Sequence, residues 1–180
     1  MRLHPFTADL AATVAAWATS PAEAIMWCGH PGVPVPTEKV IAWADEDGVR
    51  PFGLYAAGRL VAYGELWVDE EEAEVELARL IVDPRRRRQG VGRRLVSELV
   101  IRARATYPDI FMRVHPDNLA ALRCYAAAGF VRVSAEREEL WNAPQPVRYV
   151  WLAHPRDDRT SGGDRGGPGS DVGTAPSRPR

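Results

Sequence analysis

The spacing of hydrophobic residues changes from that of a strand to that of a helix in the middle of the chain. Val75 to Val82 is rich in β-branched residues and Leu, and Asp83-Pro84 follows it. Because Pro lacks an N–H and biases the preceding residue away from helix, we expect the strand to end there. From Val91 to Arg104 hydrophobic residues recur at helical spacing (Val91, Leu95, Val96, Leu99, Val100). This spacing predicts an amphipathic helix directly after a central strand.

The segment before the central strand predicts helices first and a hairpin afterwards. Met1–Phe6 has the pattern of a short strand, and Thr7 is placed to cap a helix reaching Trp17. Ser20, Pro21 and Glu23 are three start signals for a helix that ends before Gly29. Three prolines between residues 30 and 36 indicate a loop, and a short helix opens at Thr37. After residue 48 the hydrophobic residues recur at every second position, which predicts strands over 52–56 and 60–68.

The segment after the central helix continues the alternation of strand and helix. We expect a strand over 110–114, a helix over 117–128, and strands over 130–137 and 147–152. N-terminal helices and an antiparallel meander followed by β-α-β-α-β-β make an α/β fold with one mixed sheet.

The composition indicates how much of the chain folds and which classes of partner are expected. The chain has 180 residues, 46% of them hydrophobic, and a formal net charge of −1. We expect one folded domain over 1–154. Residues 155–180 are dense in Gly, Pro, Ser, Asp and Arg, which predicts a disordered tail, although a tail that binds a partner is an alternative. The start of the chain has no apolar signal core and no run is long enough to span a bilayer, so we expect a cytoplasmic protein without a membrane partner.

Two glycines lie where the central strand passes into the central helix, in the sequence Arg87-Arg88-Gln89-Gly90-Val91-Gly92. A helix N-terminus has unpaired N–H groups and partial positive charge, and glycine lets a ligand approach the backbone. With four arginines directly before it, the stretch favours a phosphate site. It fits neither a mononucleotide P-loop nor G-x-G-x-x-G, whose third glycine would fall at Leu95. A solvated basic turn is the alternative.

Residues 118–130, NLAALRCYAAAGF, form a second motif, N-x-x-A-x-x-x-Y-x-x-x-G-F. Together with the R/Q-x-x-G-x-G/A pattern at residues 87–92, it resembles the two signatures of the GNAT superfamily of N-acetyltransferases. The resemblance covers residues 1–153 and is strongest over 75–130. An amphipathic core helix in which Tyr125 is merely packed is the alternative for the second motif alone.

The resemblance implies acetyl-CoA as cosubstrate and no metal. By this resemblance, the amides of the Gly90–Gly92 loop would hold the CoA pyrophosphate. Asn118 would hydrogen-bond the pantetheine or phosphate arm, and backbone amides near Ile81 and Val82 would polarise the thioester carbonyl. The expected cofactor-binding residues are Leu80, Ile81, Val82, Arg87, Arg88, Gln89, Gly90, Val91, Gly92, Arg93, Asn118 and Tyr125. The four histidines are scattered and predict no metal ligand set.

The same resemblance implies two catalytic residues. Tyr125 would donate a proton to the leaving thiolate. Glu76, fourteen positions before Gly90, would be the base, with Glu74 as substitute; an exposed strand carboxylate is the alternative reading. Arg79 falls on the opposite face unless a bulge resets the alternation. Cys124 is read as a packed thiol, because acetyl transfer by direct attack needs no covalent enzyme intermediate.

The acceptor remains open at this stage. Tryptophans in the N-terminal helices (Trp17, Trp27, Trp43), with Tyr63 and Trp67, line either an acceptor groove or the core. The acidic turn 69–72 favours a cationic amine, such as a small-molecule amine or a peptide or protein N-terminus; a turn that is simply solvated is the alternative. Nucleic acid is not expected, because no aromatics interleave the arginines at 85–88. A homodimer is left open, and a silent acyl-CoA-binding module is the rival function.

Overall fold

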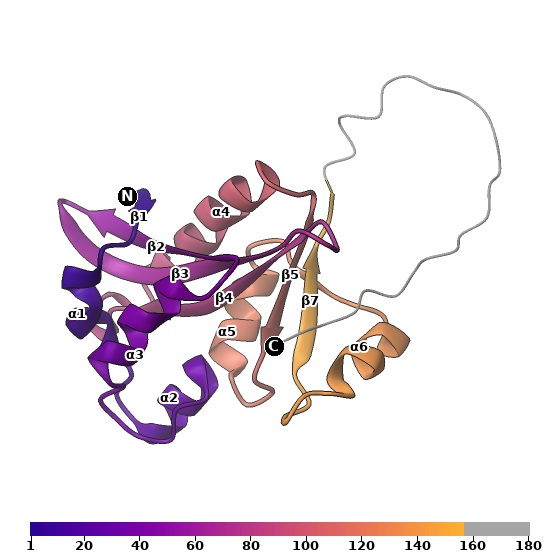
Figure 1. The fold of residues 1–180 in the computed structure, drawn as a ribbon, viewed down its shortest axis with the longest axis horizontal. Helices are drawn as coiled ribbons and strands as arrows, with labels where there is room; N and C mark the ends of the chain where they lie inside the picture. The colour runs from indigo at the N-terminus through magenta and orange to yellow at the C-terminus, as the bar shows by residue number, and fades with distance from the viewer. Residues whose placement is uncertain (157–180) are drawn as a thin grey trace.

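A computed structural model describes residues 1–156 and contains one seven-stranded mixed sheet. The strands lie in the order β1-β2-β3-β4-β5-β7-β6 (Figure 1). Their bounds are β1 Arg2–Pro5, β2 Val49–Ala56, β3 Arg59–Asp69, β4 Glu74–Val82, β5 Asp109–Val114, β6 Val131–Arg132 and β7 Val150–His154. The α-helices are α1 Ala11–Ala15, α2 Pro21–Cys28, α3 Thr37–Ala42, α4 Val91–Arg104, α5 Leu119–Ala126 and α6 Ala135–Asn142. Short 3₁₀ turns lie at Ala8–Leu10 (η1), Trp43–Asp45 (η2) and Pro84–Arg86 (η3). The predicted mixed α/β class is confirmed.

The N-terminal segment follows the predicted order, with one difference. The α2 start is as expected: the Ser20 hydroxyl accepts from the Glu23 N–H at 3.2 Å, and Gly29 ends the helix with a φ of +69°. The helix predicted from Thr7 to Trp17 is instead the turn η1 followed by the short α1, and Thr7 makes no side-chain cap. Such 3₁₀ turns are frequent at the N-termini of α-helices.

The strands β4 and β5 run parallel but pair over only three positions. The pairing ends at Glu76 and Phe111, although β4 continues to Val82 and β5 to Val114. Beyond that point the two strands diverge. Since α4 follows β4 and α5 follows β5, both helices begin beside the opening between the strands.

The segment after α5 differs from the prediction. The strand expected over 130–137 is reduced to β6, and residues 135–142 form α6. The Ser134 hydroxyl accepts from the Arg137 N–H at 3.3 Å, and Glu136 and Glu138 lie in the first turn. A capped start with acidic residues favours helix over strand. The strand β7 then lies between β5 and β6.

Hydrophobic clusters cover both faces of the sheet. On one face α4 packs Leu95, Val96 and Leu99 against the strands. On the other, α1–α3 contribute one cluster that includes Tyr63 and Ile81, and α6 forms a smaller one around Trp141 (Figure 1). Among residues 1–156 no helix is both long and apolar enough to cross a bilayer.

The last described residues contact the sheet and α4. Arg104 donates to the carbonyl oxygen of Pro155, and Arg156 forms two hydrogen bonds with Asp109. Most of the predicted tail, 157–180, lies outside the described residues. Pro155 and Arg156, which make these contacts, lie beyond the predicted domain boundary at residue 154. That boundary stays a prediction.

Candidate active site

A cleft of about 410 Å³ opens where β4 and β5 diverge. Its walls come from the second half of β4, the end of β5, the start of α5 and the side of α2. Six of the residues expected to bind cofactor line it: Leu80, Ile81, Val82, Arg87, Asn118 and Tyr125. The structure therefore brings together the β4 and α5 parts of the predicted site.

A bulge in β4 shapes the wall of this cleft. Tyr63 of β3 pairs with Ile81 and Glu65 pairs with Ala78, so two β4 residues lie opposite Gly64. One of them is Arg79, whose φ is +48°. A bulge shifts the alternation of side chains by one residue. The bulge that would reset the alternation at Arg79 is therefore present, and the Arg79 side chain lies on the same face of the sheet as Glu65.

Apart from Arg87, the predicted phosphate loop lies outside the lining of the cleft, at the N-terminus of α4. Arg88 and Gly90 both have positive φ, at +60° and +77°, and the first turn of α4 holds no acidic residue. The remaining loop positions are Gln89, whose amide donates to the Arg85 carbonyl, buried Val91, and exposed Arg93.

Gly92 has a packing role that the sequence did not suggest. A Cβ on Gly92 would lie 3.2 Å from the Cys124 Sγ and 3.7 Å from a methyl of Val82. The glycine therefore permits α4 to approach α5 closely, whatever it does for a ligand. Burial raises the pKa of the Cys124 thiol, which agrees with a packed thiol.

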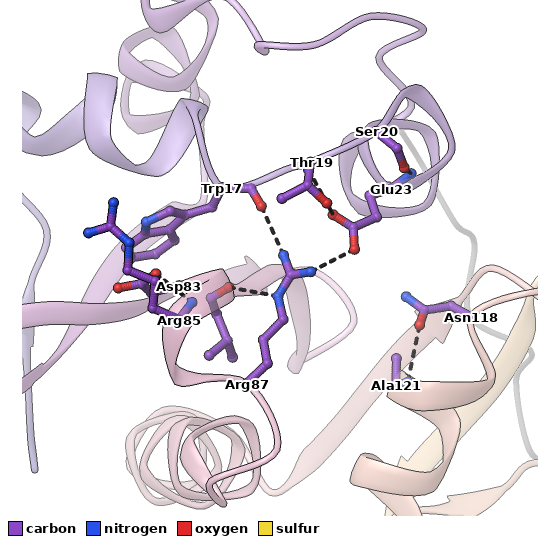
Figure 2. A network of polar contacts seen from close by, with 10 residues as sticks. Trp17, Thr19, Ser20, Glu23, Asp83, Arg85, Arg87, Asn118 and Ala121 are labelled. Carbon is purple, nitrogen blue, oxygen red and sulfur yellow. Dashed lines mark hydrogen bonds and ion pairs between the residues drawn. The ribbon is translucent and has the colours of Figure 1, made fainter.

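Arg87 is held by protein groups on three sides (Figure 2). Its guanidinium donates to the Glu23 carboxylate at 2.6 Å and to the carbonyls of Trp17 at 2.8 Å and Val82 at 3.2 Å. Burial raises the pKa of Glu23, but hydrogen bonds from Thr19 and Arg87 outweigh it, so that the pKa lies below its usual value. Arg87 thus ties α2 to the end of β4.

Asn118 and Tyr125 lie about two turns apart along α5, both at the cleft. The Asn118 oxygen caps α5 by accepting from the Ala121 N–H at 3.1 Å, so its amide nitrogen is the group left to donate to a ligand (Figure 2). Burial raises the pKa of the Tyr125 phenol above its ordinary value. The hydroxyl is therefore protonated at neutral pH and can donate.

Glu76, the predicted base, is buried and forms an ion pair across the point where the strands diverge. Its carboxylate lies 2.9 Å from the Arg113 Nε on β5. Arg113 also donates to the Gln145 side chain at 3.1 Å. Glu76 lines a second groove, of about 820 Å³, together with Glu46, Asp47, Asp69, Glu70, Glu71 and Glu74; Arg79 borders both this groove and the cleft.

A buried carboxylate, Glu65 on β3, was missed in the sequence. It accepts from the Tyr63 hydroxyl at 2.5 Å, the Trp67 indole at 2.6 Å and Arg79 at 3.1 Å. Its burial raises its pKa to about 7, against the opposing influence of Arg79 and the two ring donors. A charged residue between two aromatics in a strand of alternating pattern was the available signal, because it must be buried with partners.

The tryptophans divide between core and site. Trp17 and Trp43 are buried in the core around α1–α3, as is Tyr63. Trp27 lines the cleft and Trp67 lines the acidic groove. Within residues 1–156 no group of three or more His, Cys, Asp or Glu side chains could hold a metal ion.

Known proteins resemble this chain in sequence and in fold. An N-alpha-acetyltransferase RimI of Mycobacterium tuberculosis is 41% identical over 64 residues, which are 36% of this chain and only 39% of that relative. The structure of AAC(6')-Ib with paromomycin and acetyl-CoA has a TM-score of 0.68 at 19% identity and covers 86% of this chain and 92% of its own. A point mutant of the spermidine N-acetyltransferase SpeG of Vibrio cholerae has a TM-score of 0.63 at 18% identity, with coverages of 86% and 94%.

The family assignment rests on more than half of the chain. Residues 14–130 match the Acetyltransferase (GNAT) family, and this range includes both motifs and both diverging strands. The chain belongs to the Acetyltransferase (GNAT) family.

Proposed function

We propose that this protein transfers an acetyl group from acetyl-CoA to a primary amine by direct attack in a ternary complex. The observation that carries the proposal is the cleft between β4 and β5. It lies beside the α4 N-terminus and shares Arg79 with an acidic groove. One molecule can thus lie along the cleft while a second arrives from the groove.

The chain offers groups that suit each part of acetyl-CoA. The α4 N-terminus, with exposed Arg88 and Arg93 and no acid in its first turn, suits the pyrophosphate. The backbone of residues 80–82 lies beyond the β4–β5 pairing and suits an extended pantetheine arm, toward which Asn118 offers its amide. We assign the cofactor to these residues, with Arg87 supporting the end of β4.

Two proton transfers accompany the chemistry. We assign Tyr125 as the acid that donates to the departing thiolate, because its phenol is protonated and borders the cleft. We retain Glu76 as the base for the acceptor ammonium. Since Glu76 is paired with Arg113, accepting this proton requires the carboxylate to act while it is held by the guanidinium. Amides near Ile81 would polarise the thioester carbonyl.

The acceptor proposed is a cationic amine, either a small molecule or a peptide or protein N-terminus. Two features support it. The groove that meets the cleft at Arg79 carries seven carboxylates and two arginines, which attracts ammonium groups. The similar proteins named above are described by acceptors of this chemistry, namely an N-terminal α-amine and spermidine.

The test measures CoA release with a thiol reagent across a panel of amines, together with acetyl-CoA affinity by calorimetry. We expect turnover with at least one amine, and acetyl-CoA affinity reduced tenfold or more by Arg93→Glu. The matched control is Arg102→Glu, which makes the same charge change at the other end of α4 and should leave the affinity within twofold. Binding without turnover on any amine would favour a silent acyl-CoA-binding module, and equal effects of the two variants would refute the phosphate site.

A further inference from the structure

The bulge of β4 is clamped by groups from three other elements. Arg79 has a left-handed backbone conformation, which is costly for a residue with a side chain. Its carbonyl accepts from the Trp27 indole of α2 at 2.8 Å. Its guanidinium contacts the rings of Trp43 and Trp67, at 4.4 and 4.7 Å from the ring centroids. Such a conformation persists where the surroundings hold it.

The charge at the centre of this clamp is Glu65. Arg79 binds both Glu46 oxygens at 3.0 and 3.1 Å, but that carboxylate is exposed, whereas Glu65 has no exposed surface. An ion pair out of water is screened less than one at the surface. Glu65 is itself fixed by the hydroxyl of Tyr63 and the indole of Trp67. It is therefore the partner best placed to fix the orientation of Arg79.

We propose that Glu65 is a positioning residue for acetyl transfer, which acts through Arg79 to hold the β4 bulge that forms the wall of the cleft. The residues held in this way, Arg79 to Ile81, are lining residues of the cleft. Glu65 is fully buried and is not among the residues that line the cleft or the acidic groove. The inference rests on the proposed function only in its effect on turnover; its effect on the bulge is independent of any reaction.

The first experiment examines the bulge without ligand. In Glu65→Gln, which removes the charge, we expect hydrogen exchange at the amides of residues 78–82 of the folded variant to be at least tenfold faster than in the parent. The control is Glu138→Gln, which removes a carboxylate bound twice by Arg132 of the edge strand β6 and should leave exchange in residues 78–82 unchanged. Unchanged exchange in Glu65→Gln would overturn the proposal, whether or not the parent turns over any amine.

The second experiment uses turnover and pH. At saturating acetyl-CoA we expect kcat of Glu65→Gln to be tenfold or more below the parent at pH 8.5, with acetyl-CoA affinity within threefold. This deficit should shrink toward pH 5.5, because Glu65, with its pKa near 7, becomes neutral in the parent as well. The other titratable groups that face Glu65 (Tyr63, Arg79, Glu46 and Cys28) are the same in both proteins, and the ratio also cancels titration of the acceptor. A deficit that stays constant with pH, or a kcat within twofold, would contradict the positioning role.

A second variant approaches the clamp from α2 without altering a buried charge. Trp27→Phe keeps an aromatic ring and removes the N–H that binds the Arg79 carbonyl. We expect it to accelerate exchange over the same residues, 78–82. If both variants left this exchange unchanged while folded, strand pairing alone would hold the bulge. If only Trp27→Phe accelerated it, the indole and not Glu65 would hold the bulge. Either result would overturn the inference.

Discussion

The ion pair between Glu76 and Arg113 gives the sharpest test of the site, because it bears on both stability and chemistry. The exposed fractions of the two side chains are 9% for Glu76 and 15% for Arg113. Glu76→Gln keeps the shape and removes the charge, so the loss should be that of a charged hydrogen bond, about 1.5–3 kcal/mol. Arg113→Met leaves the carboxylate buried without its guanidinium, which costs about 3–5 kcal/mol.

These energies translate into different melting temperatures. At about 2–4 °C per kcal/mol for a chain of this size, we expect the midpoint to fall by about 3–12 °C in Glu76→Gln and by about 6–20 °C in Arg113→Met. Scanning calorimetry at neutral pH measures both. A control is Arg132→Met, whose partner Glu138 is also a carboxylate but whose own side chain is 64% exposed. We expect a loss of about 1 kcal/mol or less there. A Glu76→Gln midpoint within 1 °C of the parent would refute the reasoning.

Measurements of turnover distinguish a catalytic base from a purely structural carboxylate at Glu76. If Glu76 accepts the proton, Glu76→Gln lowers kcat by about 10²–10⁴ at neutral pH. Arg113→Met keeps the carboxylate and should retain the larger part of the activity at a temperature where it is folded. If Glu76 only ties β4 to β5, we expect the opposite order, with a lower kcat in Arg113→Met than in Glu76→Gln. A Glu76→Gln kcat within a few-fold of the parent would exclude the base.

Three further outcomes follow from single groups. Tyr125→Phe keeps the ring and should lower kcat about 10²-fold with little change in acetyl-CoA affinity; steady-state kinetics that left kcat unchanged would exclude the acid role. The folded pKa of Glu65, about 7, lies above the ordinary 4.5, so its contribution to stability is complete below pH 4.5 and is lost as the pH rises through 7. Denaturant unfolding of the parent should therefore show up to about 3 kcal/mol of this loss between those pH values, and Glu65→Gln should not show it. Truncation after Arg156 removes residues whose composition offers no core and should leave melting and turnover unchanged, whereas truncation after His154 also removes the contacts of Pro155 and Arg156 and should lower the melting temperature.

Elements with local end signals could be predicted from the sequence closely. The bounds of α4 are those predicted, because hydrophobic spacing and Gly90 both define its start. The helix α6 was missed because its buried side chains are only Trp141 and Asn142, which leaves no hydrophobic stripe to detect. The cap at Ser134 was visible in the sequence, but Val131 and Val133 alternate as in a strand and outweighed it.

The site divides in the same way. The half proposed to bind the cofactor lies in two contiguous motifs, so spacing alone could predict the loop at Gly90 and the helix with Asn118 and Tyr125. The other half depends on contacts between segments far apart in sequence, such as Arg79 with Glu65. It also depends on a bulge that moves Arg79 to the other face of the sheet. From the alternation of side chains one can predict that a bulge would move Arg79 to the other face. The sequence pattern of the strand does not reveal that the bulge is present.

Two of the arginines that line the cleft, Arg79 and Arg113, explain how its proposed acceptor side keeps its form. Both lie against the ring of Trp67, Arg79 at 4.7 Å and Arg113 at 5.3 Å from the centroid. Two cations on one indole would repel each other, but each has its own buried carboxylate, Glu65 or Glu76. The stack joins the β4 bulge to β5 on the far side of the opening, so it fixes the separation of the strands as well as the charge between them. Because this layer is paired internally, we expect the proposed amine acceptors to be discriminated by groups at the rim of the cleft, above all those of the acidic groove.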